Sequence, residues 1–185
     1  MYRLFVAIDL PDLVTRRLID ICYGLPGAKW VDETRLHITL KFIGEVDGAV
    51  FQDAQEALAT VQVKGFDLTL KGIGFFPLRR TPETLWVGVE KSDLLSRLRN
   101  RVESALKQVG LPSEGRKFTP HVALARLKGT PPERVARFLA EHSLLKLGPF
   151  PVTEFCLYSS FLSSERALHQ VEASYNLTDR RSDNQ

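Results

Sequence analysis

The sequence of 185 residues predicts an α+β fold of two similar lobes, each with the element order β-α-β-α-β. Apolar residues alternate, or recur at helical spacing, in the same order in both halves of the chain. The third element of each half is a strand with a histidine, His37 or His121, and these residues lie 84 positions apart. A repeat of this length indicates two lobes related by a pseudo-two-fold axis, which would bring the two histidine strands to face each other across a groove.

The first lobe begins with an apolar strand, Tyr2 to Asp9. Periodicity then predicts a helix at 13–22, a loop at 25–35, a strand at 36–44, a helix up to Val61 and a strand at 66–73. Gly24 is expected to end the first helix and Asp47 to cap the second, because glycine and aspartate favour these positions.

A connector at 75–83, with two prolines and the adjacent Arg79 and Arg80, is expected to be exposed between the lobes. The second lobe is predicted to contain a strand at 84–90, a helix capped by Ser92, the His121 strand, a helix after 131, a strand at 150–161 and a short last strand at 171–175. The sequence Thr130-Pro131-Pro132-Glu133 indicates a capping box. The lobes, at about 1–74 and 84–177, form a single predicted domain, and the polar segment 178–185 is expected to be a flexible tail.

The composition is that of an ordinary soluble globular protein, with 44% hydrophobic and 25% charged residues. A net charge of +3 permits an anionic ligand but does not identify one. No apolar run is long enough to span a bilayer, and the N-terminus does not have the pattern of a signal peptide. Cys22 and Cys156 have no metal-ligand spacing and are expected to be small buried side chains. We therefore expect a cytoplasmic protein without membrane association.

Strand alternation from 36 to 44 places His37, Thr39 and Lys41 on one face, at intervals of about 7 Å, and Leu36, Ile38, Leu40 and Phe42 on the other. A histidine, a hydroxyl and a cation in one row suit the binding of an anion. The strand that begins at His121 repeats the histidine and the alternation, and it has a cation, Arg126, at its far end. Two such strands predict one site built from two halves.

Paired imidazoles suit general acid/base catalysis, because with a pKa near 6.5 one can be neutral while the other is protonated. An attacking oxygen and a leaving oxygen on opposite sides of one phosphorus need that arrangement. His142 and His169 lack such a context and are expected to be structural. Two histidines are too few ligands for zinc, and neither a nucleophile elbow nor a phosphate-binding glycine loop is present.

The motifs His37-Ile38-Thr39-Leu40 and His121-Val122-Ala123-Leu124, with Arg126 after the second, resemble the paired His-x-Thr/Ser-x motifs of the 2H phosphoesterase superfamily. Within it the chain is most similar to the RNA 2′,3′-cyclic phosphodiesterases, also called 2′-5′ RNA ligases. The similarity spans nearly the whole chain and includes the runs that begin at Arg3, Leu40, Leu85 and Phe118.

This resemblance implies a bilobal fold with mostly antiparallel sheets around a central cleft, and hydrolysis without a metal or cofactor. It implies that His37 is the general acid for the leaving ribose oxygen and that His121 is the general base for water. Thr39 would donate a hydrogen bond to a phosphate oxygen. Arg126 would be a second anion contact, although strict alternation places it on the face opposite His121 unless the strand bulges.

One departure from the family pattern is Ala123, where Thr or Ser is usual. Loss of one such donor typically costs about 10²–10³ in rate. The change is compatible with a weakened enzyme, with another donor in place of the hydroxyl, or with a protein that binds but barely turns over. We favour the second interpretation. The candidate donors are Lys41, Arg79, Arg80, Arg116, Tyr158 and Ser160.

The sequence thus predicts hydrolysis of RNA 2′,3′-cyclic phosphates to 2′-phosphomonoesters. The alternatives are reversible 2′-5′ joining of RNA ends, and a non-catalytic module that binds RNA or nucleotides. The expected partners are RNA ends or cyclic-phosphate nucleotides, and nothing in the sequence demands more than a monomer.

Overall fold

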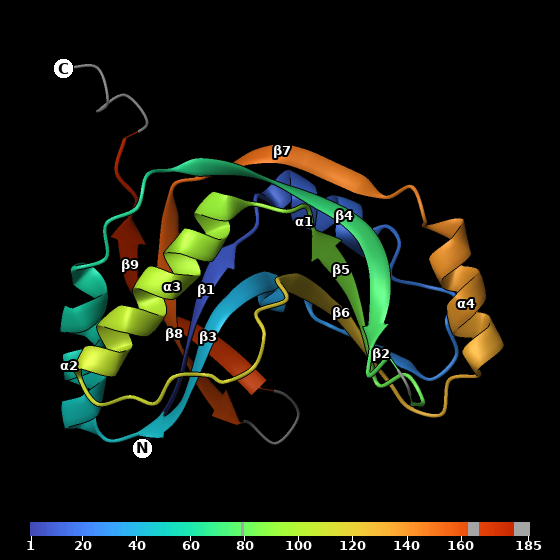
Figure 1. Ribbon diagram of the computed structural model, residues 1–185. Helices are drawn as coiled ribbons and strands as arrows, with labels where there is room; N and C mark the ends of the chain where they lie inside the picture. The colour runs from blue at the N-terminus through green and yellow to red at the C-terminus, as the bar shows by residue number, and fades with distance from the viewer. Residues whose placement is uncertain (79, 163–166, 180–185) are drawn as a thin grey trace.

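The computed structural model describes residues 1–78, 80–162 and 167–179, and within them the strands form one nine-stranded sheet (Figure 1). All its strand pairs are antiparallel, which confirms the predicted α+β class. The strands are β1 (Tyr2–Asp9), β2 (Ala28–Trp30), β3 (His37–Val46), β4 (Phe66–Phe76), β5 (Thr84–Val89), β6 (His121–Leu127), β7 (Lys146–Val152), β8 (Glu154–Leu162) and β9 (Ala167–Asn176).

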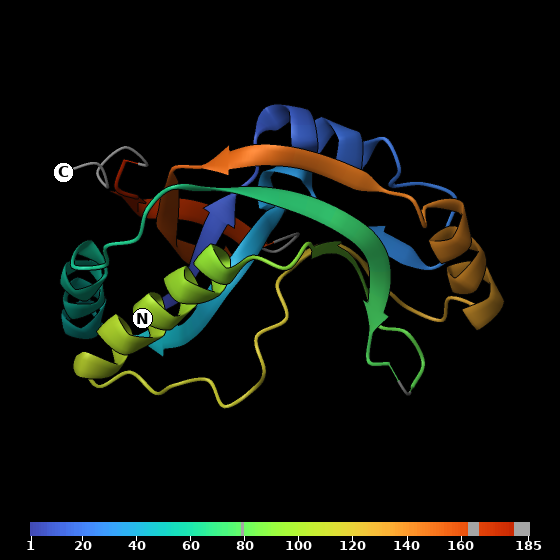
Figure 2. The ribbon, with the colours of Figure 1, turned by 45° about the horizontal axis from the view of Figure 1, so that its top comes forward.

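The two histidine strands lie at the centre of the sheet. Its order is β7-β4-β5-β6-β3-β1-β8-β9, with β2 also paired to β6. Reading outward from the junction of β6 and β3, β5 corresponds to β1 and β4 corresponds to β8. Figures 1 and 2 show that the paired strands β4 and β7, at one end of the sheet order, curve side by side. The sheet therefore has the form of a half-barrel.

The last strands of the two predicted lobes are exchanged. Strand β4 pairs with β5 and β7 of the second half of the chain, whereas β8 pairs with β1 of the first half. Each half of the sheet therefore draws on both halves of the sequence, and the boundaries predicted near 74 and 84 do not separate the halves in space. Element order along the chain fixes the repeat, but it does not fix which strands pair.

Two further strand predictions differ from the structure. Residues 28–30, expected in a loop, form the short strand β2 beside β6. The single strand expected at 150–161 is divided at Thr153 into β7, which forms one edge of the sheet, and β8, which lies next to β9 at the other edge. A continuous run of apolar and aromatic residues does not reveal this division, because both parts have strand character.

Four helices are present in the described part of the chain: α1 (Asp12–Ile19), α2 (Gly48–Ala59), α3 (Asp93–Gln108) and α4 (Pro132–Glu141). The predicted N-caps of α2 and α3 are confirmed. Asp47 Oδ1 accepts a hydrogen bond from the Val50 amide at 2.9 Å, and Ser92 Oγ accepts one from the Leu95 amide at 3.2 Å.

The predicted capping box before α4 is wrong. The N-cap is Pro131, and no side chain caps this helix. The Thr130 hydroxyl instead donates to the Pro26 carbonyl at 2.7 Å. Thr130 is buried, so its hydroxyl needs a partner within the fold, and the loop that contains Pro26 supplies one.

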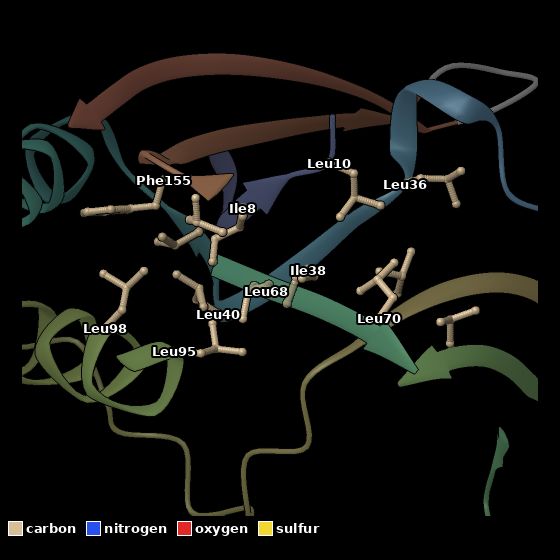
Figure 3. Close-up of a cluster of buried hydrophobic side chains, with 14 of the residues drawn as sticks. Ile8, Leu10, Leu36, Ile38, Leu40, Leu68, Leu70, Leu95, Leu98 and Phe155 are labelled. Atoms are coloured by element: carbon tan, nitrogen blue, oxygen red, sulfur yellow. The ribbon is translucent and has the colours of Figure 1, made fainter. Parts of the chain in front are cut away.

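The core lies between the helices and one face of the sheet. Figure 3 shows Leu95 and Leu98 extending from α3 toward Leu40 of β3 and Leu68 of β4. These side chains are at most 2% exposed, so this face of the central strands is closed to solvent. The opposite face holds a second, smaller buried cluster made of Phe5, Ala7, Cys156 and Tyr158.

Both cysteines are free. Cys156 is buried, as predicted, whereas Cys22 is only half-buried and its Sγ donates to the Leu18 carbonyl at 3.1 Å. Burial raises the pKa of Cys22 to about 11, so this thiol stays protonated at neutral pH.

At the other end of the chain, the predicted tail begins with an ordered residue. The Thr178 amide donates to the Val63 carbonyl, and the Thr178 carbonyl accepts from the Gly65 amide. Residues 180–185 lie outside the described part of the chain.

Candidate active site

His37 and His121 share the face of the sheet that lies opposite the core. Ile38 of β3 is paired with Val122 of β6, and both are fully buried. Neighbouring residues of a strand point to opposite faces, so the two histidines project from the other face. In this antiparallel register they are diagonal neighbours, with side chains about 7–8 Å apart at their bases. The two halves of the chain thus bring the predicted pair together.

The same register places Thr39 opposite His121 and Ala123 opposite His37. Each histidine therefore faces the residue that follows the other histidine by two positions. The hydroxyl missing at Ala123 is consequently missing beside His37, whereas the Thr39 hydroxyl lies beside His121.

A bulge in β3 interrupts the alternation after Thr39. Thr39 pairs with Ala7 of β1 and Lys41 pairs with Val6, which leaves Leu40 as an extra residue between two adjacent partners. Leu40 and Lys41 are both buried as a result. The strand therefore turns its next side chain, rather than Lys41, back toward the histidine face.

The prediction that Lys41 lies on the histidine face is wrong. Lys41 is 3% exposed, and its Nζ contacts Glu103 Oε1 of α3 at 3.1 Å and the Pro112 carbonyl at 2.7 Å. Phe42, predicted for the core face, is instead 66% exposed. Strict alternation assigned both residues incorrectly because it does not include the extra residue.

Strand β6 has a bulge at the matching place. Leu85 and Trp86 of β5 pair with Ala125 and Ala123, which leaves Leu124 as the extra residue. Leu124 and Ala125 are both buried. The duplication therefore extends to this irregularity, three residues after each histidine.

The bulge returns Arg126 to the face that contains His121. This is the condition on which its predicted role as an anion contact depended. Arg126 is exposed and pairs in register with Thr84 on one side and Lys29 on the other. Its equivalent in the other half of the site is Phe42, so this strand position holds a cation in the His121 half but not in the His37 half.

His121 is held by a backbone carbonyl and two aromatic rings. Its Nδ1 lies 2.7 Å from the Thr119 carbonyl, which can only accept, so Nδ1 is the donor and Nε2 has a free lone pair in the neutral ring. Phe76 packs edge-on at 5.2 Å between ring centroids, and Trp86 lies at 6.2 Å. This tautomer suits a proton acceptor at Nε2.

His37 lies in a more enclosed aromatic environment. Its ring stacks on Phe5 at 5.1 Å, with Tyr158 at 6.1 Å and His169 at 5.6 Å. Burial, together with the charges of His169 and Arg35, lowers the pKa of His37 to about 4. In the free protein His37 is therefore neutral at pH 7.

His169 is a site residue that the sequence analysis missed. It lies on β9 opposite Ser160 of β8, and its ring meets Phe5 edge-on at 4.8 Å between centroids. Only the second half of β9 was predicted as a strand. Extending the alternation backward from Val171 would have placed His169 on the same face as that residue.

The six candidate replacements for the missing hydroxyl lie in different environments. Lys41 is buried and forms an ion pair with Glu103, and the Tyr158 hydroxyl donates to the Asp9 carboxylate. Ser160 is half-buried, and Arg80 and Arg116 are exposed. Arg79 lies outside the described residues.

In the part of the chain that the structure covers, no three His, Cys, Asp or Glu side chains gather closely enough to hold a metal ion. Within the same residues, no helix is long and apolar enough to cross a membrane.

A sequence model of the 2′-5′ RNA ligase superfamily matches residues 15–160 of this chain. An RNA 2′,3′-cyclic phosphodiesterase of Archaeoglobus fulgidus is 33% identical over 171 residues, which cover 91% of this chain and 96% of the relative. A Thermotoga maritima protein of the same name is 33% identical, with coverage of 91% and 92%.

A similar fold occurs among solved structures. The crystal structure of Escherichia coli LigT in apo form has a TM-score of 0.79 to this chain and 27% sequence identity. The similarity covers 96% of this chain and 98% of LigT.

Proposed function

This chain belongs to the 2′-5′ RNA ligase superfamily, and we propose that it hydrolyses RNA 2′,3′-cyclic phosphodiesters to 2′-phosphomonoesters. Several relatives with 33–35% identity are named RNA 2′,3′-cyclic phosphodiesterase. Crystal structures of E. coli LigT, 26% identical, contain 3′-AMP or phosphate. These names support a substrate of the same chemical class for this chain.

The observation that carries the proposal is a diagonal pair of histidines in unlike environments on one face of the sheet. Groups that act as acid and base at the same pH need environments that separate their protonation behaviour. His121 has its Nδ1 occupied by the Thr119 carbonyl, whereas His37 lies among aromatic rings. We therefore assign the two roles to different histidines.

His121 acts as the general base. Its Nε2 takes a proton from a water molecule as the water oxygen attacks phosphorus. The bond between phosphorus and the ribose 3′ oxygen breaks, and that oxygen takes a proton from His37, the general acid. The product has a phosphate on the 2′ oxygen and a free 3′ hydroxyl.

His37 must gain a proton before it can act as an acid. Its pKa of about 4 in the free protein is set chiefly by burial. A negatively charged phosphate beside the ring favours the imidazolium, so substrate binding raises this pKa. The bound phosphate thus favours the protonated form of the proposed acid, which takes its proton from solvent.

Thr39 and Arg126 are the proposed phosphate contacts. The Thr39 hydroxyl can donate to a non-bridging oxygen, and the Arg126 guanidinium can bind the anion. Both residues belong to the histidine face through the register and the bulge of their strands.

The test is turnover of a short RNA that ends in a 2′,3′-cyclic phosphate, in EDTA, from pH 5 to 9. We expect hydrolysis with a bell-shaped pH dependence of kcat/KM. Replacement of His37 or His121 by alanine should each lower kcat/KM by about 10²–10⁴. His142→Ala is the matched control, because His142 ends α4 and packs on Phe138 rather than on this face.

Absence of turnover by the wild-type protein would favour a non-catalytic binding module, which the alanine at position 123 makes a specific alternative. Turnover that survives loss of both histidines would refute the acid/base assignment.

Reversible 2′-5′ joining is the second candidate function, because the matching superfamily bears that name. It is the same chemistry with a ribose hydroxyl in place of water. Incubation with a second RNA that has a 5′ hydroxyl should then yield a longer product.

A further inference from the structure

Arg35 and His169 lie beside His37 and have no role in the proposed reaction. Arg35 ends the short 3-10 helix at Glu33–Arg35, two residues before His37. His169 reaches His37 from β9, at the edge of the sheet order, with 5.6 Å between ring centroids. Residues from the N-terminal and C-terminal parts of the chain therefore meet at one side of the proposed general acid.

Both residues have a buried polar atom without a partner. Arg35 Nε and His169 Nδ1 are inaccessible to solvent, and neither forms a hydrogen bond with the described part of the chain. Arg35 also forms no ion pair among the described residues. A guanidinium that is partly desolvated without a counter-charge is costly, so such an arrangement is expected where a ligand supplies the anion.

Arg35 carries the positive charge that acts on both imidazoles of this cluster. Burial lowers the pKa of His169, and the charge of Arg35 lowers it further, as it also does for His37. Asp9 is the carboxylate in register with His37, and it accepts a hydrogen bond from the Tyr158 hydroxyl. One guanidinium beside two neutral imidazoles, each able to donate from a ring N–H, is a suitable set for phosphate oxygens.

We propose that Arg35 and His169 form a second phosphate subsite, which binds the phosphate on the 5′ carbon of the ribose whose cyclic phosphate is opened. This inference rests on the proposed function, in which His37 protonates the ribose 3′ oxygen. That role puts the ribose at His37, so groups beyond His37 face the rest of the same nucleotide. In a nucleotide chain one ribose separates consecutive phosphates, so the 5′ phosphate lies on the other side of the ribose from the cyclic phosphate. A guanidinium such as that of Arg35 binds a phosphate through two parallel hydrogen bonds.

The subsite makes the protein selective for a terminal nucleotide with a phosphate on its 5′ side. Three substrates separate the contributions: adenosine 2′,3′-cyclic phosphate, its 5′-phosphorylated form, and the dinucleotide ApA with a 2′,3′-cyclic phosphate. We expect kcat/KM to be at least about tenfold higher for the second and third than for the first. If only the dinucleotide gains, the subsite accepts the internal phosphodiester of RNA. If the 5′-phosphorylated mononucleotide gains equally, it recognises the phosphate itself.

Arg35→Gln and His169→Gln should each remove most of this preference. The exposed Arg137 of α4 offers a matched control, since Arg137→Gln removes the same charge from a helix that lies far from β9 (Figure 1). Equal losses on all three substrates in the Arg35 and His169 variants would overturn the proposal, because these residues would then act through His37 alone. Equal kcat/KM of the wild-type protein for all three would also overturn it.

A binding measurement tests the subsite without turnover. By calorimetry, the wild-type protein should bind adenosine 2′,5′-bisphosphate at least about tenfold more tightly than adenosine 2′-monophosphate. Arg35→Gln should bind the two ligands alike, whereas Arg35→Lys should keep part of the difference. Hydrolysis of adenosine 2′,3′-cyclic phosphate reports separately on the proposed function, so failure of the subsite and failure of the function can be told apart.

Discussion

The two halves of the site share a backbone plan and differ in nearly every side chain that surrounds the histidine. In both, the histidine begins a central strand, and a bulge follows three residues later. The equivalent positions hold Thr39 and Ala123, Lys41 and Ala125, and Phe42 and Arg126. The backbone thus positions the two imidazoles in the same way, whereas the neighbouring side chains give the two rings different chemical environments.

The proposed acid and base roles rest on this difference between the two halves. His121 has a fixed tautomer, because the Thr119 carbonyl accepts from its Nδ1. His37 is surrounded by Phe5, Tyr158 and a second imidazole, which disfavours its charged form until an anion arrives. The assignment of roles therefore follows from environment rather than from the motif that the two strands share.

The largest effect is expected at the position where one half has a buried cation and the other has alanine. Lys41→Ala should lower the free energy of unfolding by about 3 kcal/mol, because it removes the ammonium partner of the mostly buried Glu103 carboxylate and leaves that carboxylate with the Arg99 guanidinium alone, 3.4 Å away. Urea denaturation at pH 7 measures the change.

A second lysine–glutamate pair provides the control for this prediction. Lys71 and Glu90 are 4.0 Å apart with half-exposed or more exposed side chains, so Lys71→Ala should cost less than about 1 kcal/mol. Equal losses in the two variants would show that the Lys41 pair is not buried in solution.

The next largest effect concerns the hydroxyl that only one half has. Thr39→Ala should lower kcat/KM by about 10²–10³, because the developing phosphorane charge loses a preorganised donor. Ala123→Thr should raise kcat/KM, by up to the same factor, since the added hydroxyl lies beside His37. Single-turnover kinetics on an RNA cyclic phosphate measures both variants.

The double variant Thr39→Ala with Ala123→Thr moves the hydroxyl from one half to the other. A rate above that of Thr39→Ala alone would show that either half can supply the donor. No gain from Ala123→Thr in either background would mean that another group already fills that role.

Much of this arrangement was predictable, because the repeat is visible as periodicity. The alternation around His37 and His121 predicted two strands, and Asp47 and Ser92 marked the starts of the helices α2 and α3. The α+β class with mostly antiparallel sheets was implied by the resemblance to the 2H phosphoesterase superfamily. Local preferences and hydrophobic patterns are sufficient for such features, because each depends on residues close in sequence.

The remaining features depend on contacts between distant parts of the chain. A bulge is a mismatch between two strands, so the sequence of β3 or β6 alone could not reveal it, and Lys41 was assigned to the wrong face. The face on which Arg126 lies depends on the bulge in β6, so strand alternation alone did not determine it. His169 lies near His37 because β9 pairs with β8 and β8 in turn pairs with β1, and neither pairing is visible in the sequence of β9 alone.

The smallest predicted effect is a pH dependence of stability that comes from the His37 half of the site. The pKa of His37 is about 4 in the folded protein and near 6.5 in an unfolded chain. Between these values the unfolded chain binds a proton that the folded protein does not. The stability is therefore complete above about pH 6.5 and is lost as the pH falls toward 4.

Urea denaturation between pH 6.5 and 4.5 should show this loss, on the order of 2 kcal/mol in the wild-type protein. His37→Gln should reduce the slope, whereas His142→Gln should not. A smaller part of the slope should persist, because burial also lowers the pKa of His169. The groups that face His37 are Asp9 of β1, Tyr158 of β8, His169 of β9, and Arg35, and of these His169 has a pKa that burial shifts below its usual value. Inorganic phosphate should further reduce the slope of the unfolding free energy against pH, because it favours the imidazolium form of His37. Identical slopes for the wild-type protein and His37→Gln would contradict a buried neutral His37.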